Sequence, residues 1–354
     1  MEEFFNGQYL YVLGEKGLKA SLQLDLNPNL LKKECSQLLQ EDTVLLEKRL
    51  QEDLCFNLLL PEKIAKHTLH AGGKRLRPLL VIHAAKMIGR SDENDRFIKV
   101  ASSLELIHMA TLIHDDVVDH ASTRRGKPTA STLYGNTRSI LTGDMLLAKA
   151  MCILAEDGEL AILTAVSEMV LKMAEGQLYE IQSRGKFELT EEEHLKILQM
   201  KTASFMECCC FVGGVLGKAS SKELEKLKEY GHNLGMAFQL TDDLLDFCGH
   251  KDETGKANAT DFKEGCVTLP LIYLRSKIGE NEKEFVQSRL GTNVTEDEIN
   301  TLKRWMEEKK VFGESKSLAY YYVDQAQKAL EKFSPSSSLN ILGVLLKSSI
   351  EREF

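Results

Sequence analysis

The sequence predicts an all-α protein, and three observations lead to that fold class. Only 6 prolines occur in the 354 residues, so few positions are closed to a helix. Apolar side chains recur at intervals of three and four residues over long segments, which is the spacing of an amphipathic helix. No stretch alternates apolar and polar residues in the way that predicts a strand. Because no linker divides the pattern, we expect an irregular N-terminal segment at residues 1–30 and a single all-helical domain over residues 31–354.

Breaks in the helical pattern place the elements in order. Thr190 is a strong helix start, because its hydroxyl can cap the helix and Glu193 follows three residues later. The polar, glycine-containing residues 249–265 and residues 126–128 are predicted loops. The first expected helix covers residues 30–60, and Pro61 can open a short helix after it. Further helices are expected over residues 78–88, then from a cap at Asp92 or Asn94 through residue 119, and then up to Leu154, where residues 142–144 precede or interrupt the helix. The remaining helices are expected over residues 160–182, 190–216, 221–248 and 268–278, with three more after residue 293.

The composition excludes several classes of protein. The net charge of −8 argues against a nucleic-acid-binding protein. No apolar run is long enough to span a membrane, and the acidic N-terminus lacks the basic region of a signal peptide, so we expect a cytoplasmic protein. The 8 cysteines show no paired Cys-x-x-Cys spacing. The consecutive Cys208, Cys209 and Cys210 would point in different directions on a helix, so free thiols are favoured over a metal site.

Three aspartates interrupt an apolar run at residues 112–119. Residues four apart share a helix face, so Asp115 and Asp119 are expected one turn apart, with Asp116 beside them. Carboxylates that close raise one another's pKa unless a cation joins them. Mg²⁺ takes oxygen ligands, commonly one or two carboxylates together with substrate phosphates. A single cluster of this kind is more often a solvated acidic helix face.

The same pattern occurs again within residues 238–247, where Asp242, Asp243 and Asp246 have the same spacing in the same apolar setting. Two such helices could face each other across one cavity and hold several metal ions around a diphosphate. The pair is far more specific than either cluster alone, so we favour a metal–diphosphate site over two solvated helix faces.

A diphosphate site also needs cationic side chains, and two segments supply them. In the segment 72–78 the paired glycines allow a tight turn, and Lys74 and Arg77 could converge on one oxyanion. Arg124 and Arg125 follow closely after the first aspartate cluster. Each segment alone would be read as a solvated loop, and the signals at Lys201–Thr202 and at Lys256 are weaker still.

Together, the segments GGKRLRP, HDDVVD followed by RRGKPT, GDMLLA, KT, FQLTDDLLDF and TLPLI resemble the trans-isoprenyl diphosphate synthases, in order and in spacing. The resemblance spans roughly residues 35–354 and favours the long-chain type, such as octaprenyl, heptaprenyl and solanesyl diphosphate synthases. It implies an isoprenoid-synthase-type bundle of long antiparallel helices around a deep central cavity, in a homodimer. The implied reaction is a head-to-tail condensation, in which an allylic diphosphate ionises and isopentenyl diphosphate attacks with loss of diphosphate and a proton.

The resemblance also implies a role for each matching residue. The cofactor would be about two or three Mg²⁺ ions, held by the carboxylates of both clusters. The implied metal ligands are Asp115, Asp116, Asp119, Asp242, Asp243 and Asp246. The implied contacts to the allylic diphosphate are the catalytic Arg124 and Lys201 together with Lys256, with Thr202 and Gln239 nearby. The implied contacts to isopentenyl diphosphate are Lys74, Arg77, His108 and Arg125. Two positions depart from the family pattern: Cys266 replaces a frequent lysine, and Asp261 lies in an unusual context.

The length of the product is predicted from the helix that leads into the first cluster. Ala110 and Thr111 lie about one turn before Asp115, and short-chain relatives carry a bulky aromatic residue at the Ala110 position. A small residue leaves the channel open, so we expect a product longer than geranylgeranyl, of the kind used for quinone side chains. The cavity floor would lie near Val170 or Met173. So apolar a product suggests transient contact with a membrane during release.

Three alternatives remain at this point. A short-chain synthase making farnesyl or geranylgeranyl diphosphate is disfavoured by Ala110. A non-catalytic partner subunit of a heteromeric synthase would typically have lost aspartates, and all six are present here. A structural metal-binding protein would leave the basic segments without an explanation.

Overall fold

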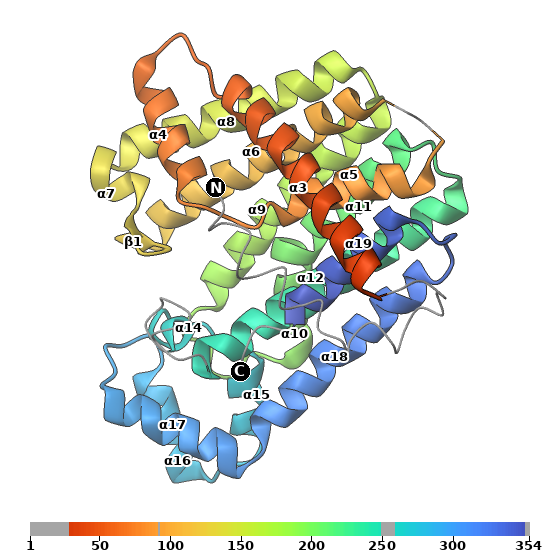
Figure 1. The fold of residues 1–354 in the computed structure, drawn as a ribbon. Coiled ribbons are helices and arrows are strands. Elements are labelled where there is room, and N and C mark those ends of the chain that lie inside the picture. The colour runs from red at the N-terminus through yellow and green to blue at the C-terminus, as the bar shows by residue number, and fades with distance from the viewer. Residues whose placement is uncertain (1–27, 91–92, 249–258, 351–354) are drawn as a thin grey trace. The chain divides into compact units, whose positions relative to one another are not determined.

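The computed structural model describes residues 28–90, 93–248 and 259–350, and these residues are almost entirely helical (Figure 1). The predicted all-α class is confirmed. The predicted irregular segment 1–30 lies outside the described residues except for 28–30, which already belong to the first helix. Most of the predicted loop 249–265 also lies outside them. No helix of the described residues combines the length and the apolar character that crossing a bilayer requires.

The chain divides into two compact units. The first comprises residues 1–167, 208–227 and 333–345, and the second comprises residues 168–207, 228–332 and 346–354. The single helical domain over residues 31–354 stays a prediction. Each unit is described by itself below.

In the first unit, α6 is the central helix and packs along α8 as well as against α3 and α5 (Figure 1). Gly143 permits the close approach of α8, because a Cβ atom there would overlap the His114 imidazole on α6. The elements of this part of the chain are α3 (Pro28–Asp53), α4 (Leu59–His70), α5 (Leu76–Ile88), α6 (Asn94–Val118), β1 (Thr123–Arg124), β2 (Lys127–Pro128), α7 (Ala130–Tyr134) and α8 (Asn136–Asp157).

Three expectations for this part of the chain were wrong. The helix predicted over residues 30–60 ends at Asp53. The break expected near residues 142–144 does not occur, since α8 runs through it and Gly143 serves close packing. Residues 123–128 contain a two-stranded antiparallel hairpin. Strands of two residues are too short to show an alternating pattern, so no sequence signal was available.

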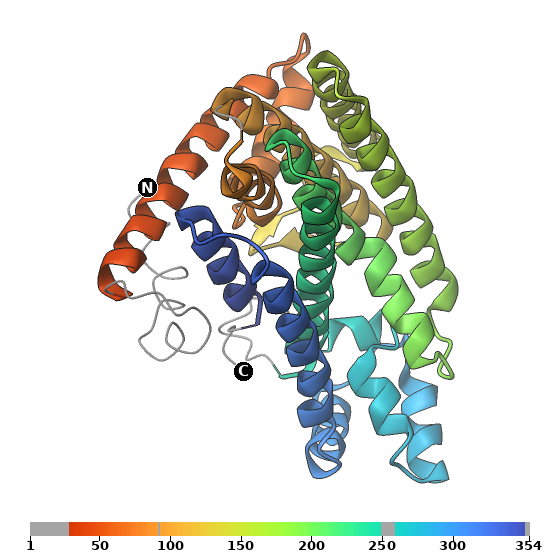
Figure 2. The same cartoon turned by 90° about the vertical axis from the view of Figure 1, so that its right-hand side faces the viewer.

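In the second unit, α15 (Leu269–Arg275) packs against α17 (Glu296–Glu308) and α18 (Val311–Leu330), which are the cyan and blue helices of Figure 2. A buried apolar cluster that includes Phe247, Phe262 and Leu302 forms its core. The further elements that lie wholly in this unit are α10 (Glu191–Leu198), the π-helix η1 (Gln199–Ala203), α14 (Thr260–Lys263) and α16 (Glu280–Arg289). Four helices carry residues of both units: α9 (Leu160–Ser183), α11 (Ser204–Leu216), α12 (Ser221–Cys248) and α19 (Ser337–Ile350).

The predicted boundaries of α12 are confirmed, and so is the helix start at Thr190. The Thr190 side chain accepts from the Glu193 backbone N–H, while Glu193 reciprocally accepts from the Thr190 N–H. The helix predicted over residues 190–216 is interrupted by the five-residue π-helix. Such a segment changes the direction of its side chains within a continuous helix and is frequent at functional sites.

Candidate active site

The first aspartate cluster lies at the C-terminal end of α6. Asp115 and Asp116 belong to its last turn, and Asp119 is the cap residue, whose N–H donates to the Asp115 carbonyl at 2.8 Å. A helix C-terminus carries partial negative charge, so three carboxylates there are electrostatically unfavourable without cations. This position therefore favours the binding of positive charge.

The three carboxylates of the first cluster are not equivalent. Asp116 is only 5% exposed and accepts a hydrogen bond from Arg124 Nε at 2.7 Å. Its burial raises its pKa, and the charge of Arg124 opposes that shift. Asp115 and Asp119 are half-buried. Asp116 therefore orients a cationic side chain, while its two neighbours present carboxylates that remain partly accessible.

The hairpin after α6 carries two of the predicted cations. Arg125 and Gly126 form its turn with φ values of 52° and 73°, which is the left-handed geometry of a tight two-residue hairpin. Lys127 Nζ donates to the His70 carbonyl at 2.7 Å, and His67 Nε2 contacts the Pro128 carbonyl at 2.8 Å. These two contacts attach the hairpin to α4 and so bring it beside the loop that follows α4.

The loop before α5 is anchored by Arg75, a residue to which the sequence assigned no role. Gly72, Gly73 and Arg75 have φ values of 90°, 154° and 49°. Arg75 is 8% exposed and donates to Glu47 Oε1 at 2.6 Å, to Glu105 Oε1 at 3.0 Å and to the Leu69 carbonyl at 2.9 Å. Its burial favours the neutral form, but Glu105 and Glu47 outweigh this effect and raise its pKa. Arg75 therefore holds the loop in place.

The anchored loop brings the predicted cations together. A Cβ atom on Gly73 would lie 2.9 Å from Arg125 Nη1, so the hairpin guanidinium lies directly against this glycine of the loop. Arg77 Nη1 lies 3.1 Å from His108 Nε2. Desolvation, followed by the charges of Arg77 and Arg125, holds the pKa of His108 well below its ordinary value, so the imidazole is neutral and accepts this hydrogen bond.

The electrostatics of this cluster favour an anion. The pKa of Arg125 is lowered, first by desolvation and then by repulsion from Arg124 and Arg75. An anion placed among these side chains would relieve that repulsion. Within the first unit, the structure thus brings together the predicted residues Arg77, His108, Arg124 and Arg125, while Lys74 is half-buried in the same loop.

The channel residues predicted on α6 have two different environments. Ala110 is 2% exposed and Thr111 is half-buried. The Thr111 hydroxyl donates to the His108 carbonyl at 2.8 Å, so it is satisfied within the helix. Val170 and Met173, the predicted floor, are half-buried positions on α9 in the second unit.

The three carboxylates of the second aspartate cluster also differ in burial and in the groups that donate hydrogen bonds to them. Asp243 is 3% exposed and accepts from Gln239 Nε2 at 3.1 Å and from His194 Nε2 at 2.9 Å. Asp246 accepts from the backbone N–H groups of Thr260 and Asp261, each at 3.0 Å, and so holds the start of α14. Asp242 is half-buried.

The π-helix presents Lys201 and Thr202. Lys201 Nζ donates to Glu180 Oε1 at 2.7 Å, and Thr202 Oγ1 donates to Gln239 Oε1 at 3.0 Å. Two glycines permit neighbouring helices to approach this turn. A Cβ atom on Gly176 would lie 3.0 Å from the Lys201 nitrogen, and one on Gly235 would lie 2.5 Å from the Ala203 Cα. Lys201 and Thr202 are therefore held by backbone packing as well as by hydrogen bonds.

Sequence reasoning missed Glu180 and His194 in this unit. His194 precedes Lys201 by seven residues, which places both on one face of a regular helix, and this spacing was the available signal. Lys256 lies outside the described residues. Cys266 is a neutral thiol, because burial and then the carboxylates of Glu180 and Asp261 raise its pKa.

The donor chemistry fits a hard divalent cation. Asp115, Asp119 and Asp242 offer carboxylate oxygens at half-buried positions, which suit Mg²⁺. Among the residues that the structure describes, no three His, Cys, Asp or Glu side chains are gathered closely enough to form a cation site by themselves. Mg²⁺ ordinarily completes its coordination with water and substrate phosphates.

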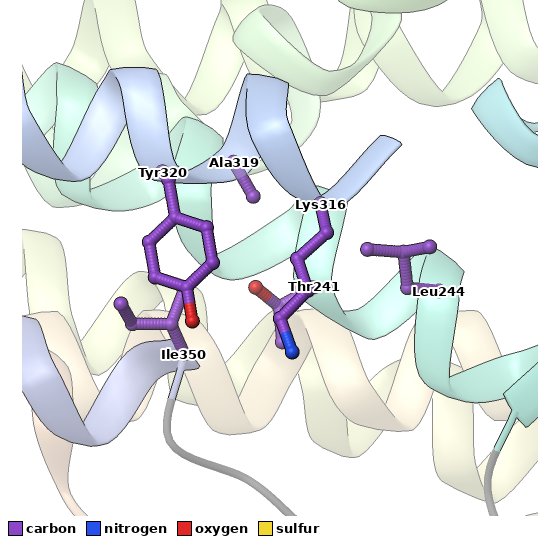
Figure 3. A pocket seen from close by; sticks show the side chains of 6 residues that line it. All are labelled: Thr241, Leu244, Lys316, Ala319, Tyr320 and Ile350. Carbon is purple, nitrogen blue, oxygen red and sulfur yellow. The ribbon is translucent and has the colours of Figure 1, made fainter. Parts of the chain in front are cut away.

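A small pocket in the second unit is lined by residues that the sequence did not predict for the site. Figure 3 shows its lining by Thr241, Leu244, Lys316, Ala319, Tyr320 and Ile350. The Thr241 hydroxyl donates to the Ala237 carbonyl at 2.8 Å and is thereby satisfied. We assign this pocket no part in the site.

The chain is similar to several known proteins. The model of the polyprenyl synthetase family matches residues 60–307. The octaprenyl diphosphate synthase of Escherichia coli is 35% identical over 67% of this chain and 73% of its own length. The geranylgeranyl diphosphate synthase of Saccharolobus solfataricus is 36% identical over the same shares. A polyprenyl synthase from Caulobacter crescentus, solved with calcium and isoprenyl diphosphate, is 32% identical and superposes with a TM-score of 0.86 over 91% of this chain and 98% of that one.

Proposed function

Because the chain belongs to the polyprenyl synthetase family, it is a prenyltransferase, and we propose that it adds isopentenyl diphosphate units head-to-tail to an allylic diphosphate. The product is a long all-trans polyprenyl diphosphate, of the kind attached to quinones. One observation carries the proposal: the anchored cations Arg77, Arg124 and Arg125 lie in the same unit as the carboxylates that end α6.

The isopentenyl diphosphate is bound by the cationic cluster. Lys74, Arg77 and Arg125 contact its diphosphate. A bound anion relieves the repulsion that Arg125 experiences from neighbouring arginines, among them Arg77. The neutral His108 orients Arg77 by accepting from Nη1. Arg75 contributes indirectly, by holding the loop that carries Lys74.

The allylic diphosphate is held by both aspartate clusters. Mg²⁺ would be held by the carboxylates of both clusters, namely Asp115, Asp116, Asp119, Asp242, Asp243 and Asp246. The hydrogen bonds that Asp116, Asp243 and Asp246 accept would orient these three carboxylates. When bound, Mg²⁺ neutralises the charge that builds on the leaving diphosphate. Arg124 and Lys201 add direct contacts, and their carboxylate partners Asp116 and Glu180 fix their positions.

The chemistry then follows from the chain's own residues. Positioned cations weaken the bond between the allylic C1 and the diphosphate oxygen, and this bond breaks to leave an allylic carbocation. The double bond of isopentenyl diphosphate attacks C1, and the departing diphosphate accepts the proton lost from the new chain. Gln239 and Thr202 are hydrogen-bonded to each other and lie beside Lys201 at the allylic diphosphate. Lys256 is a further proposed contact to the same diphosphate.

The long product rests on Ala110. A methyl side chain at a 2% exposed position one turn before Asp115 contributes no aromatic ring to block a growing chain. A relative named for a geranylgeranyl product makes the short-chain alternative the main rival. The protein works in the cytoplasm as a homodimer and contacts a membrane transiently when it releases its product. Exposed apolar side chains on α7 and α8, namely Leu133, Ile140 and Leu141, support self-association.

The experiment uses the purified protein alone. It is incubated with radiolabelled isopentenyl diphosphate, farnesyl diphosphate and Mg²⁺, with and without detergent, and the dephosphorylated products are sized by reversed-phase chromatography. A ladder ending at a long polyprenol is expected. Products that stop at geranylgeraniol would refute the long-chain proposal, and incorporation no higher than in an EDTA-treated blank would refute catalysis by this chain alone.

A further inference from the structure

A buried histidine that the mechanism above does not use contacts the second aspartate cluster. His194 is 4% exposed, Asp243 is 3% exposed, and 2.9 Å separates His194 Nε2 from Asp243 Oδ2. The two residues are 49 positions apart in the sequence. A carboxylate oxygen can only accept, so the imidazole donates its Nε2 proton. Burial makes each member of such a pair dependent on the other for hydrogen bonding.

The contact belongs to a connected chain of four side chains. Gln239 Nε2 donates to the other Asp243 oxygen at 3.1 Å, and this fixes which end of the amide faces Thr202. Gln239 Oε1 therefore accepts from Thr202 Oγ1, at 3.0 Å. Both oxygens of Asp243 are occupied, and the segment formed by α10 and the π-helix is connected to α12 at two points, through His194 and through Thr202.

His194 is itself rigidly placed. It lies in the first turn of α10, directly after the reciprocal cap of Thr190 and Glu193, and Lys186 Nζ donates to Glu193 at 2.7 Å. The Arg275 guanidinium donates to the Phe187 and Leu189 carbonyls and fixes the approach to the helix. Because the backbone that carries His194 is held in place, the hydrogen bond from its imidazole can hold the Asp243 carboxylate in one position.

We propose that His194 is a positioning residue for the allylic-diphosphate end of the site. Through Asp243 it fixes the face of α12 that carries Asp242 and Gln239, relative to the π-helix that carries Lys201 and Thr202. Groups that hydrogen-bond to a metal-binding carboxylate commonly change metal affinity or activity by about ten- to hundredfold when they are removed. This inference rests on the proposed function, because the proposed function names the allylic diphosphate as the ligand of this site.

The test compares three substitutions of His194. His194→Leu removes the donor, and His194→Asn retains polarity but is too short to reach Asp243. His194→Gln carries an amide nitrogen at nearly the distance of Nε2 from the backbone and can restore the hydrogen bond. The matched control is His83, a 1% exposed histidine in the first unit that contacts Ser338, changed to Leu and to Gln.

Binding is measured by calorimetry with two ligands. The first is a farnesyl thiolodiphosphate, which does not ionise readily, in the presence of Mg²⁺; the second is isopentenyl diphosphate without metal. We expect the Leu and Asn variants of His194 to bind the first ligand about ten- to hundredfold more weakly and the second unchanged, with Gln within about threefold of wild type. The His83 variants should bind both ligands as wild type does.

Three results would overturn the inference: wild-type binding of the thiolodiphosphate by both the Leu and Asn variants, equal loss with Gln, or equal weakening for both ligands. The last result would indicate general structural damage. The failure of the proposed function is distinguishable, because it is read from product formation by the wild-type protein, whereas the positioning role is read from binding.

Discussion

Replacing Arg75 by methionine tests whether this residue anchors the cationic loop. Its three hydrogen bonds have unequal value. Glu47 is 34% exposed, so that ion pair contributes about 0–1 kcal/mol. The Leu69 carbonyl loses a hydrogen bond worth about 1 kcal/mol. Glu105 is 4% exposed and would remain as an uncompensated buried carboxylate, which costs about 3–5 kcal/mol. We expect the free energy of unfolding to fall by about 4–7 kcal/mol, mostly because of Glu105.

Urea titration of the wild type and of R75M, E105M and R75M/E105M measures this effect. Because the double variant removes the isolated charge, it should be more stable than R75M by about 2 kcal/mol or more. The control is R90M, whose ion pair with Glu223 has a 51% exposed arginine, and it should lose less than about 1 kcal/mol. Strictly additive effects of R75M and E105M would refute the reasoning, and so would a loss for R75M no larger than that for R90M.

The remaining predictions concern the product, the pH and the metal. A110F should shorten the longest product, because a ring replaces a methyl group one turn before Asp115; an unchanged chromatographic ladder contradicts the length prediction. Burial and the charge of Lys86 lower the pKa of His83 from 6.5 to about 3. The nearby Asp42 carboxylate is already paired with Lys86, whose Nζ lies 2.6 Å from Asp42 Oδ1. Below the ordinary pKa the unfolded state binds the extra proton, so stability should fall by about 1.4 kcal/mol for each pH unit between about pH 6 and 4. In H83Q this slope should be smaller, and an equal slope in urea titrations would exclude His83 as its source. EDTA should abolish turnover and Mg²⁺ should restore it, whereas D119N should require more Mg²⁺ for half-maximal rate; a D119N activation curve identical to that of wild type would argue against Asp119 as a ligand.

The sequence alone predicted several features that a short spacing determines. The period of apolar residues predicted most of the helices, including the boundaries of α12 but not α16, and the Thr190–Glu193 spacing predicted the helix cap. The repeated aspartate pattern placed both clusters at their helical positions. Each of these features depends on residues within about one or two turns of one another, so local geometry settles them.

The tertiary structure decided what each polar side chain does. Arg75 lies in the same basic segment as Arg77, yet it is an anchor because Glu47 and Glu105, 28 and 30 residues away, reach it. Asp116 is buried and accepts from Arg124, eight residues away, and Asp243 is buried and accepts from His194, 49 residues away. Glycines in two other helices, Gly176 and Gly235, permit the close packing around the π-helix at Lys201. A spacing determines which residues share a helix face, whereas burial and long-range partners determine which of them hold the structure together and which stay accessible to a substrate.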